Sequence, residues 1–353
     1  MKFSIMFGSF IVALLLGIFP KIASQKPLWW KLTIIISVAL SLILTLYPPI
    51  SGNLNDTIYL KKGTYQEINL HLDNDGKDLI KVNGIWTKVI GKEQAVNSTF
   101  DSLAFKNKLI IKSEIVPDEF KHINKLIIKV ALNKEFNALE YKGTIAINPL
   151  LEYPFVANLG ERIRILNLHV PLAWICVVAY LMSMVYAIRY LKTKELIWDF
   201  YTTSTAALGT VFAILATVTG MLWAKFNWGA YWNWDPRQTS ILVLIMIYLA
   251  YFALRSAIDN EERKATLSSV YSIIAFVTVP FLVFILPRLT SGLHPGSADD
   301  TNSGPLVTPQ QNSLDTTLIY GFGLALLSFT LLYFWMLNLM IRYKKISYEL
   351  NEG

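Results

Sequence analysis

The chain has one cysteine and four histidines in 353 residues. Cys176 stands alone in an apolar stretch, which excludes a disulfide framework, a thiolate metal site and the Cys-x-x-Cys-His motif of c-type cytochromes. Charge is also scarce: 16% of residues are charged and 54% are hydrophobic, against about 25% charged in typical soluble domains. With a mean hydropathy of +0.42, the composition predicts a membrane protein.

Seven apolar stretches have the length that crosses about 30 Å of hydrocarbon. They lie at about 3–20, 32–48, 168–190, 201–223, 239–256, 268–287 and 315–341. The first can also be interpreted as a secretory signal peptide, because Lys2 precedes it and Ile22-Ala23-Ser24 resembles a cleavage site. The sequence thus predicts an α-helical membrane protein of about seven transmembrane helices, and leaves cleavage of the first open.

Basic residues mark one side of the predicted bundle. They lie between the first two stretches and after the third, fifth and last: Lys21, Lys26, Lys31, Arg189, Lys192, Lys194, Arg255, Arg263, Lys264, Arg342, Lys344 and Lys345. By the positive-inside rule these segments are cytoplasmic, which places residues 223–240 and His294 outside. The net charge of +7 is therefore explained by basic residues in cytoplasmic segments, which orient the protein in the membrane. It requires no nucleic-acid partner.

Residues of about 52–160 have a different composition, rich in Lys, Asn and Asp. Short runs with β-branched residues, such as Leu126-Ile-Ile-Lys-Val, alternate with turn signals such as Asn83-Gly84. They predict a small antiparallel all-β domain, with a sandwich as one arrangement, inserted after the second helix on the extracytoplasmic side. His71 and His122 are interpreted as ordinary strand or surface residues. The expected domains are a transmembrane hairpin at 1–50, the β domain at 51–160 and a transmembrane domain at 161–345.

A tryptophan-rich segment links the fourth and fifth apolar stretches. Tryptophans are ordinary at membrane interfaces, but Trp228, Trp232 and Trp234 share one short segment with Gly229 and Asp235. A glycine permits close approach of the backbone, and a carboxylate is costly in lipid. The segment therefore predicts a flat aromatic wall at the membrane surface, suited to a flat apolar ligand.

Two histidines lie on the same predicted side as this segment. His169 begins the third apolar stretch, and His294 follows the outer end of the sixth. Taken singly, His169 could cap a helix and His294 could be an exposed loop residue. As a pair beside the tryptophans, they predict metal ligands on opposite faces of a non-covalent heme b. Arg237 is the nearest cation for the heme carboxylates, with Arg164 and Arg288 as further candidates.

The segment from Trp228 to Asp235, Trp-Gly-Ala-Tyr-Trp-Asn-Trp-Asp, resembles the WWD signature of heme-handling proteins in cytochrome c biogenesis. The flanking Leu168-His169-Val-Pro171, Thr219-Gly220 and Leu293-His294 narrow this resemblance to the CcmC (heme exporter protein C) family, over about 160–341. Pro236 departs from the pattern, which more often has a small residue there. The first apolar stretch and the β region lie outside the usual six-span form.

The resemblance implies a protein that binds heme at the periplasmic face of the bacterial inner membrane. His169 and His294 become the axial ligands, and Trp228, Trp232, Trp234 and Asp235 the platform. It further implies presentation of heme to a CcmE-like heme chaperone, together with a CcmA/CcmB ABC transporter and a CcmD-like small protein. Such a protein would not be an enzyme.

Two alternatives belong to other functional classes. A cytochrome c synthetase similar to CcsA or CcmF would join heme to apocytochrome thiols, but these proteins carry further histidines within the membrane, which this sequence lacks. A membrane b-type cytochrome would exchange electrons with quinone through heme held between helices. His169 lies only at the edge of a predicted span and His294 outside one, which disfavours this class.

Overall fold

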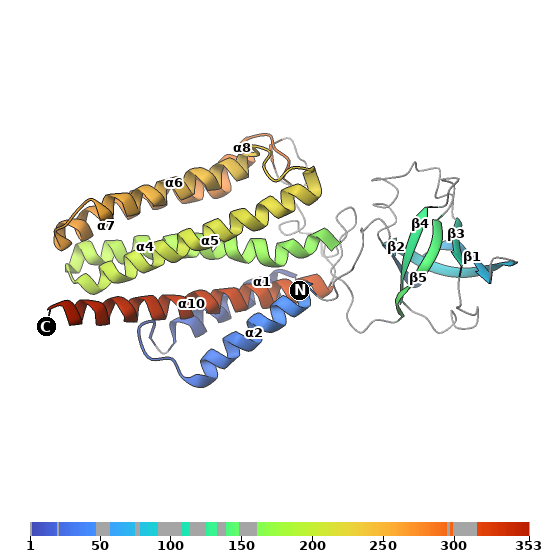
Figure 1. The fold of residues 1–353 in the computed structure, drawn as a ribbon, viewed down its shortest axis with the longest axis horizontal. Helices are drawn as coiled ribbons and strands as arrows, with labels where there is room; N and C mark the ends of the chain where they lie inside the picture. The colour runs from blue at the N-terminus through green and yellow to red at the C-terminus, as the bar shows by residue number, and fades with distance from the viewer. Residues whose placement is uncertain are drawn as a thin grey trace. The chain divides into compact units, whose positions relative to one another are not determined.

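The computed structural model describes residues 2–19, 21–46, 57–74, 78–90, 108–112, 125–132, 139–147, 161–294, 297–298 and 316–352. The chain divides into two compact units, one formed by Met1–Leu46 with Arg164–Gly353 and the other by Tyr47–Ile163. The described elements of the first unit are helical, and those of the second are almost entirely strands (Figure 1).

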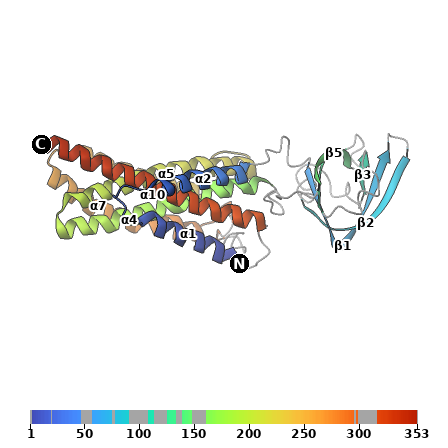
Figure 2. The same cartoon turned by 90° about the horizontal axis from the view of Figure 1, so that it is seen from below.

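The helical unit is a bundle whose long helices run side by side, as Figures 1 and 2 show. Its elements are α1 (Lys2–Ile18), α2 (Leu28–Leu46), α4 (Leu166–Thr193), α5 (Leu196–Trp228), α6 (Pro236–Ser256), α7 (Glu261–Pro280), the π-helical η5 (Phe281–Ile285), α8 (Leu286–Leu289) and α10 (Thr316–Glu352). A short 3-10 helix, η4 (Glu161–Ile165), leads into α4.

Six of the described helical segments are long and apolar enough to span a membrane. They are Leu28–Leu46, Ile163–Thr193, Leu196–Trp228, Pro236–Ser256, Glu261–Leu289 and Ile319–Leu350. The prediction of seven spans is therefore wrong. The first apolar stretch forms only α1, whose 17 residues extend about 26 Å at the α-helical rise, less than a typical hydrocarbon core.

The first helix nevertheless packs against the bundle and is linked to the segment that follows it by hydrogen bonds. Gly17 lies against the Phe334 ring of α10, with no room for a Cβ. Lys26 Nζ donates to the carbonyl oxygens of Gly17 at 3.2 Å and Phe19 at 2.7 Å, so it satisfies groups at the C-terminus of α1. Asn338 Nδ2 donates to carbonyls on both sides of Ala23. The segment that resembles a cleavage site is thus held against α10.

Buried tyrosines connect the helices α4, α5 and α6. The Tyr180 ring of α4 stacks on Tyr248 of α6, with centroids 3.5 Å apart and planes 14° from parallel. The Tyr180 hydroxyl is hydrogen-bonded to Thr210 of α5 at 3.2 Å. Gly209 lies against the same ring, where a Cβ would collide with it. These contacts fix α4, α5 and α6 relative to one another.

The second unit contains one five-stranded sheet: β1 (Thr57–Asn74), β2 (Asp78–Ile90), β3 (Lys108–Lys112), β4 (Lys125–Leu132) and β5 (Leu139–Ile147). Its order is β2-β1-β3-β5-β4, with a further pairing of β1 and β4. β1 pairs antiparallel with β2, as β4 does with β5, but β3 is parallel to both β1 and β5.

The predicted fold class is therefore wrong in two respects: the number of spanning helices, and the antiparallel all-β domain expected in this region. The described strands form one mixed sheet rather than an antiparallel domain or sandwich. Alternation of apolar and polar residues along the chain indicates where strands form. It does not show whether strands distant in sequence pair parallel or antiparallel, because that depends on the connections between them.

A buried ion pair joins α5 to α6 at the end opposite the tryptophan-rich segment. Arg255 donates from Nη1 and Nη2 to the two carboxylate oxygens of Asp199, at 2.7 and 2.8 Å. Asp199 is 3% exposed. The sequence indicated Arg255 only as a basic residue that marks the cytoplasmic side. The structure shows that it also connects α5 and α6.

We expect Asp199→Asn to destabilise the bundle, because it leaves the Arg255 guanidinium buried without its counter-charge. Breaking such a pair from one side costs about 3–5 kcal/mol, measurable as a lower unfolding midpoint of the detergent-solubilised protein. The matched control is Glu261→Gln, which removes the exposed ion pair with Lys264 and should cost less than about 1 kcal/mol. Equal losses in the two variants would contradict this role for Asp199.

Candidate functional site

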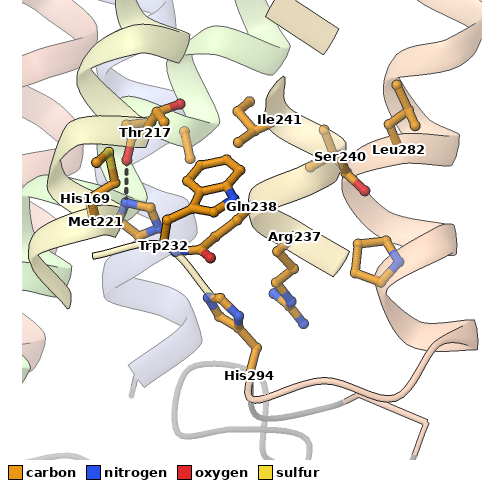
Figure 3. A pocket seen from close by; sticks show the side chains of 15 residues that line it. His169, Thr217, Met221, Trp232, Arg237, Gln238, Ser240, Ile241, Leu282 and His294 are labelled. Carbon is orange, nitrogen blue, oxygen red and sulfur yellow. Dashed lines mark hydrogen bonds between the residues drawn. The ribbon is translucent and has the colours of Figure 1, made fainter. Parts of the chain in front are cut away.

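A cavity of about 770 Å³, including the part open to solvent, lies among α4, α5, α6, η5 and α8 (Figure 3). Its lining is largely apolar, with a few polar groups: His169, Ala173, Ala216, Thr217, Gly220, Met221, Trp232, Arg237, Gln238, Ser240, Ile241, Leu282, Val283, Pro287 and His294. A concave apolar site with few convergent polar groups is the usual form of a small-molecule or cofactor site.

His169, in the first turns of α4, is held by the neighbouring helix α5. Its Nδ1 lies 2.9 Å from the carbonyl oxygen of Ala216 and 3.2 Å from Thr219 Oγ1. Because a carbonyl oxygen can only accept, Nδ1 carries the proton and Nε2 keeps its lone pair. A Cβ at Gly220 would lie 2.9 Å from His169 Cε1, so the ring occupies space that only glycine leaves open.

Asp235 begins the next helix of the site as the N-cap of α6. Its Oδ1 accepts a hydrogen bond from the backbone N–H of Arg237 at 2.9 Å, as N-cap carboxylates commonly do. Pro236 occupies the first helical position, where its missing N–H removes no intrahelical bond. The departure of Pro236 from the expected family pattern therefore fits the start of α6.

The same carboxylate holds the loop that carries His294. His294 Nδ1 lies 2.8 Å from Asp235 Oδ1, and the backbone N–H of Leu293 donates to Oδ2, also at 2.8 Å. A Cβ at Gly292 would lie 2.8 Å from Oδ2, so the loop approaches closely because residue 292 lacks a side chain. Ser297 Oγ donates to the His294 carbonyl at 2.7 Å and closes the turn.

The electrostatics of this contact keep Asp235 ionised. Burial alone would raise the pKa of its carboxyl group, but the hydrogen bonds from His294 and from the N–H groups of Arg237 and Leu293 outweigh burial and lower the pKa to about 2. A carboxylate accepts and cannot donate. A proton therefore lies on His294 Nδ1, and in the neutral ring the lone pair is on Nε2, as in His169.

The three tryptophans of the signature have three different environments. Trp232 lines the cavity. The Trp228 ring meets the His294 ring at 4.6 Å and 71°, an edge-to-face contact outside the cavity lining. Trp234 is 72% exposed and meets Trp232 edge to face at 5.7 Å. The signature thus does not form one continuous wall.

The structure brings four of the seven predicted site residues to one cavity: His169, His294, Trp232 and Arg237 (Figure 3). Trp228 and Asp235 contact His294 and influence the cavity through it, whereas Trp234 does not line it. The further candidate cations, Arg164 and Arg288, are not among the described lining residues.

Sequence reasoning missed the role of Gln238. Its Oε1 accepts from the Asn233 N–H at 2.9 Å, and its Nε2 donates to the Tyr231 carbonyl at 3.1 Å. This buried amide supports the tryptophan-rich loop and also lines the cavity. The only signal in the sequence was a long polar side chain one turn after the signature. Thr219 and Gly220 belong to the motif that carries the resemblance, but the sequence did not predict their contact with His169, because the contact joins two helices.

Part of the chain is similar to known proteins. "Heme exporter protein C" of Rhodobacter capsulatus is 31% identical over 144 residues, 41% of this chain and 60% of that protein. The protein of the same name from Paracoccus denitrificans is 32% identical over 139 residues, 39% and 58% of the two chains. That of Escherichia coli K12 is 32% identical over 186 residues, 53% and 74%. The first two matches thus span about three fifths of those relatives.

A family model gives the wider match. The model described as CcmC, heme exporter protein C, matches residues 116–352. This range begins before the expected 160–341 and includes strands β4 and β5. The match covers more than half of the sequence, and the chain therefore belongs to the heme exporter protein C family, CcmC.

Proposed function

We propose that this protein binds heme b non-covalently at the periplasmic face of the inner membrane and presents it to a heme chaperone during cytochrome c maturation. One observation carries the proposal: both histidines of one cavity have Nδ1 bound to an acceptor, which leaves both Nε2 atoms for a metal. Histidine ligands of protein-bound metals commonly have this arrangement. Membership of the CcmC family and the names of its relatives agree with it.

The other lining residues suit the remainder of a heme. Apolar side chains such as Met221, Ile241 and Leu282 offer contact to a porphyrin ring, and the Trp232 indole can pack on its face or edge. Arg237 provides a cation for the propionates. Bound here, the heme would supply the iron that both imidazoles coordinate.

The proposed side of the membrane follows from the ends of the helices. The tryptophan-rich loop lies between α5 and α6, and His294 follows α8; the two loops meet through Asp235. Arg255, Lys192 and Lys194 lie at the opposite ends of their helices. Since basic ends face the cytoplasm, the cavity would open on the periplasmic side.

The proposed role is presentation and not covalent attachment of heme. His169 and His294 would hold the iron, Trp232 would pack on the ring, and Trp228 with Asp235 would orient His294. Within the described spanning segments His169 is the one histidine, since His294 lies in the loop after α8. The lack of a further histidine pair in these segments favours a presenter over a synthetase. A CcmE-like chaperone, a CcmA/CcmB transporter and a CcmD-like small protein are the partners we propose from the family.

We expect the purified protein, expressed with sufficient heme, to show the absorption spectrum of a six-coordinate, low-spin b-type heme. His169→Ala and His294→Ala should each weaken binding or convert the heme to high spin, because each removes one axial nitrogen. His71→Ala, on strand β1, serves as a control and should leave the spectrum unchanged. A heme-free wild-type protein, or ligand variants with wild-type spectra, would refute the proposed function.

Gly220→Ala should act on the heme through His169. Its Cβ would collide with His169 Cε1, so the ring must turn away from Ala216. We expect heme affinity to fall about 10–100-fold, as when a supporting contact of a metal ligand is lost. Heme titration followed by absorbance measures this loss. Gly8→Ala is the matched control, because a Cβ at Gly8 meets nothing within 4 Å; similar losses in both variants would contradict the role of Gly220.

Co-expression distinguishes presentation from synthesis. The protein is co-expressed with a CcmE-like chaperone in one strain and with an apocytochrome in another. We expect heme to become covalently bound to the chaperone in the first strain, and not to the cytochrome in the second. Heme staining of denaturing gels reads out both products. Attachment to the apocytochrome in the absence of a chaperone would instead identify a synthetase.

A further inference from the structure

The two histidines of the cavity differ in the groups that accept their Nδ1 protons. His169 faces the uncharged carbonyl of Ala216 at 2.9 Å. His294 faces the carboxylate of Asp235 at 2.8 Å. Asp235 is 3% exposed, so water screens its charge only weakly. The site is therefore electrically asymmetric, although its two ligands are the same residue type.

This asymmetry affects the strength of each nitrogen as a ligand. A carboxylate attracts the Nδ1 proton more strongly than a carbonyl does and so increases the negative charge of the ring. The added electron density raises the basicity of Nε2. His294 should consequently bind ferric iron more tightly than His169 does.

The surroundings of Asp235 hold its carboxylate in place beside His294. The carboxylate is fixed by the N–H groups of Arg237 and Leu293, which belong to α6 and to the His294 loop. The Trp228 ring packs edge-on against the His294 ring. His169 has a second contact as well, but it is with the uncharged hydroxyl of Thr219 at 3.2 Å.

We propose that His294 is the stronger, retained axial ligand of the heme and His169 the ligand released first, with Asp235 as the positioning residue that creates the difference. This inference rests on the proposed function. On release, His169 would let go of the iron and keep the electron pair on Nε2, so the oxidation state of the heme would not change. His294 would continue to hold the heme, whose opposite face, toward α4, would then be open.

The first test is the reduction potential of the heme-loaded protein. Asp235→Asn removes the charge, and we expect the preference for ferric over ferrous heme to fall about tenfold, a 59 mV rise in midpoint potential for one electron. Asp235→Glu keeps the charge and should restore part of the difference. Thr219→Val, which removes the secondary contact of the other histidine, should change the preference less than about twofold. Equal shifts in Asp235→Asn and Thr219→Val would overturn the proposal.

The second test identifies the retained ligand directly with carbon monoxide. CO displaces the weaker ligand of ferrous heme, and the iron–CO stretching frequency then reports the histidine on the opposite side. We expect this frequency to shift in Asp235→Asn and to stay unchanged in Thr219→Val. A shift only in Thr219→Val would show that His169 is retained and would reverse the assignment.

A further pair of variants covers the case in which Asp235→Asn does not fold. With CO bound, His169→Gly should show the wild-type stretching frequency, and His294→Gly a different one; the opposite pattern would refute the inference. A wild-type protein without heme would refute the proposed function, and with it this inference. Low-spin wild-type heme whose potential and CO frequency do not respond to Asp235→Asn would refute the inference alone.

Discussion

The Asp235 carboxylate is the contact on which the geometry of the site depends. It caps α6 through the Arg237 N–H and holds the distant loop through Leu293 N–H and His294 Nδ1. One buried anion thus fixes the start of a helix, the position of a loop and the tautomer of a proposed ligand. Its lowered pKa of about 2 keeps the carboxylate ionised, and so able to accept these bonds, at neutral pH. Sharing one group among three donors also explains why a carboxylate is accommodated at the edge of an apolar bundle.

The opposite side of the cavity is fixed by helix packing instead of by charge. α4 and α5 place the His169 ring against the Ala216 carbonyl, in space left by Gly220. The stacked Tyr180 and Tyr248 rings, further along the bundle, hold α4 to α6. The cavity therefore has a rigid side built from regular helices and a side built from two loops that Asp235 joins. A ligand held between them contacts both kinds of support.

Hydrophobic length and residue type located the spanning segments and four residues that line one cavity, but not the strand pairing or the contacts that organise the candidate site. The apolar stretches located the six spanning segments, and His169 and His294 were singled out because both follow or begin such stretches on one side. The predicted N-terminal span, at about 3–20, extends past the end of α1 at Ile18. Composition alone does not show where this helix ends. The parallel pairings of β3, the support from Gln238 and the need for Gly220 all involve residues distant in sequence. Such contacts leave no periodic pattern.

The tryptophan-rich segment illustrates how local strain can serve such a contact. Trp234 has φ of 55°, a left-handed conformation that costs a non-glycine residue about 1–2 kcal/mol. This turn directly precedes the N-cap and redirects the chain so that the Asp235 side chain reaches both α6 and the His294 loop. Hydrogen bonds to a charged group contribute about 1.5–3 kcal/mol each, and Asp235 accepts three. The network therefore offsets the strain, and the exposed Trp234 indole is a consequence of how the chain turns to bring Asp235 beneath His294.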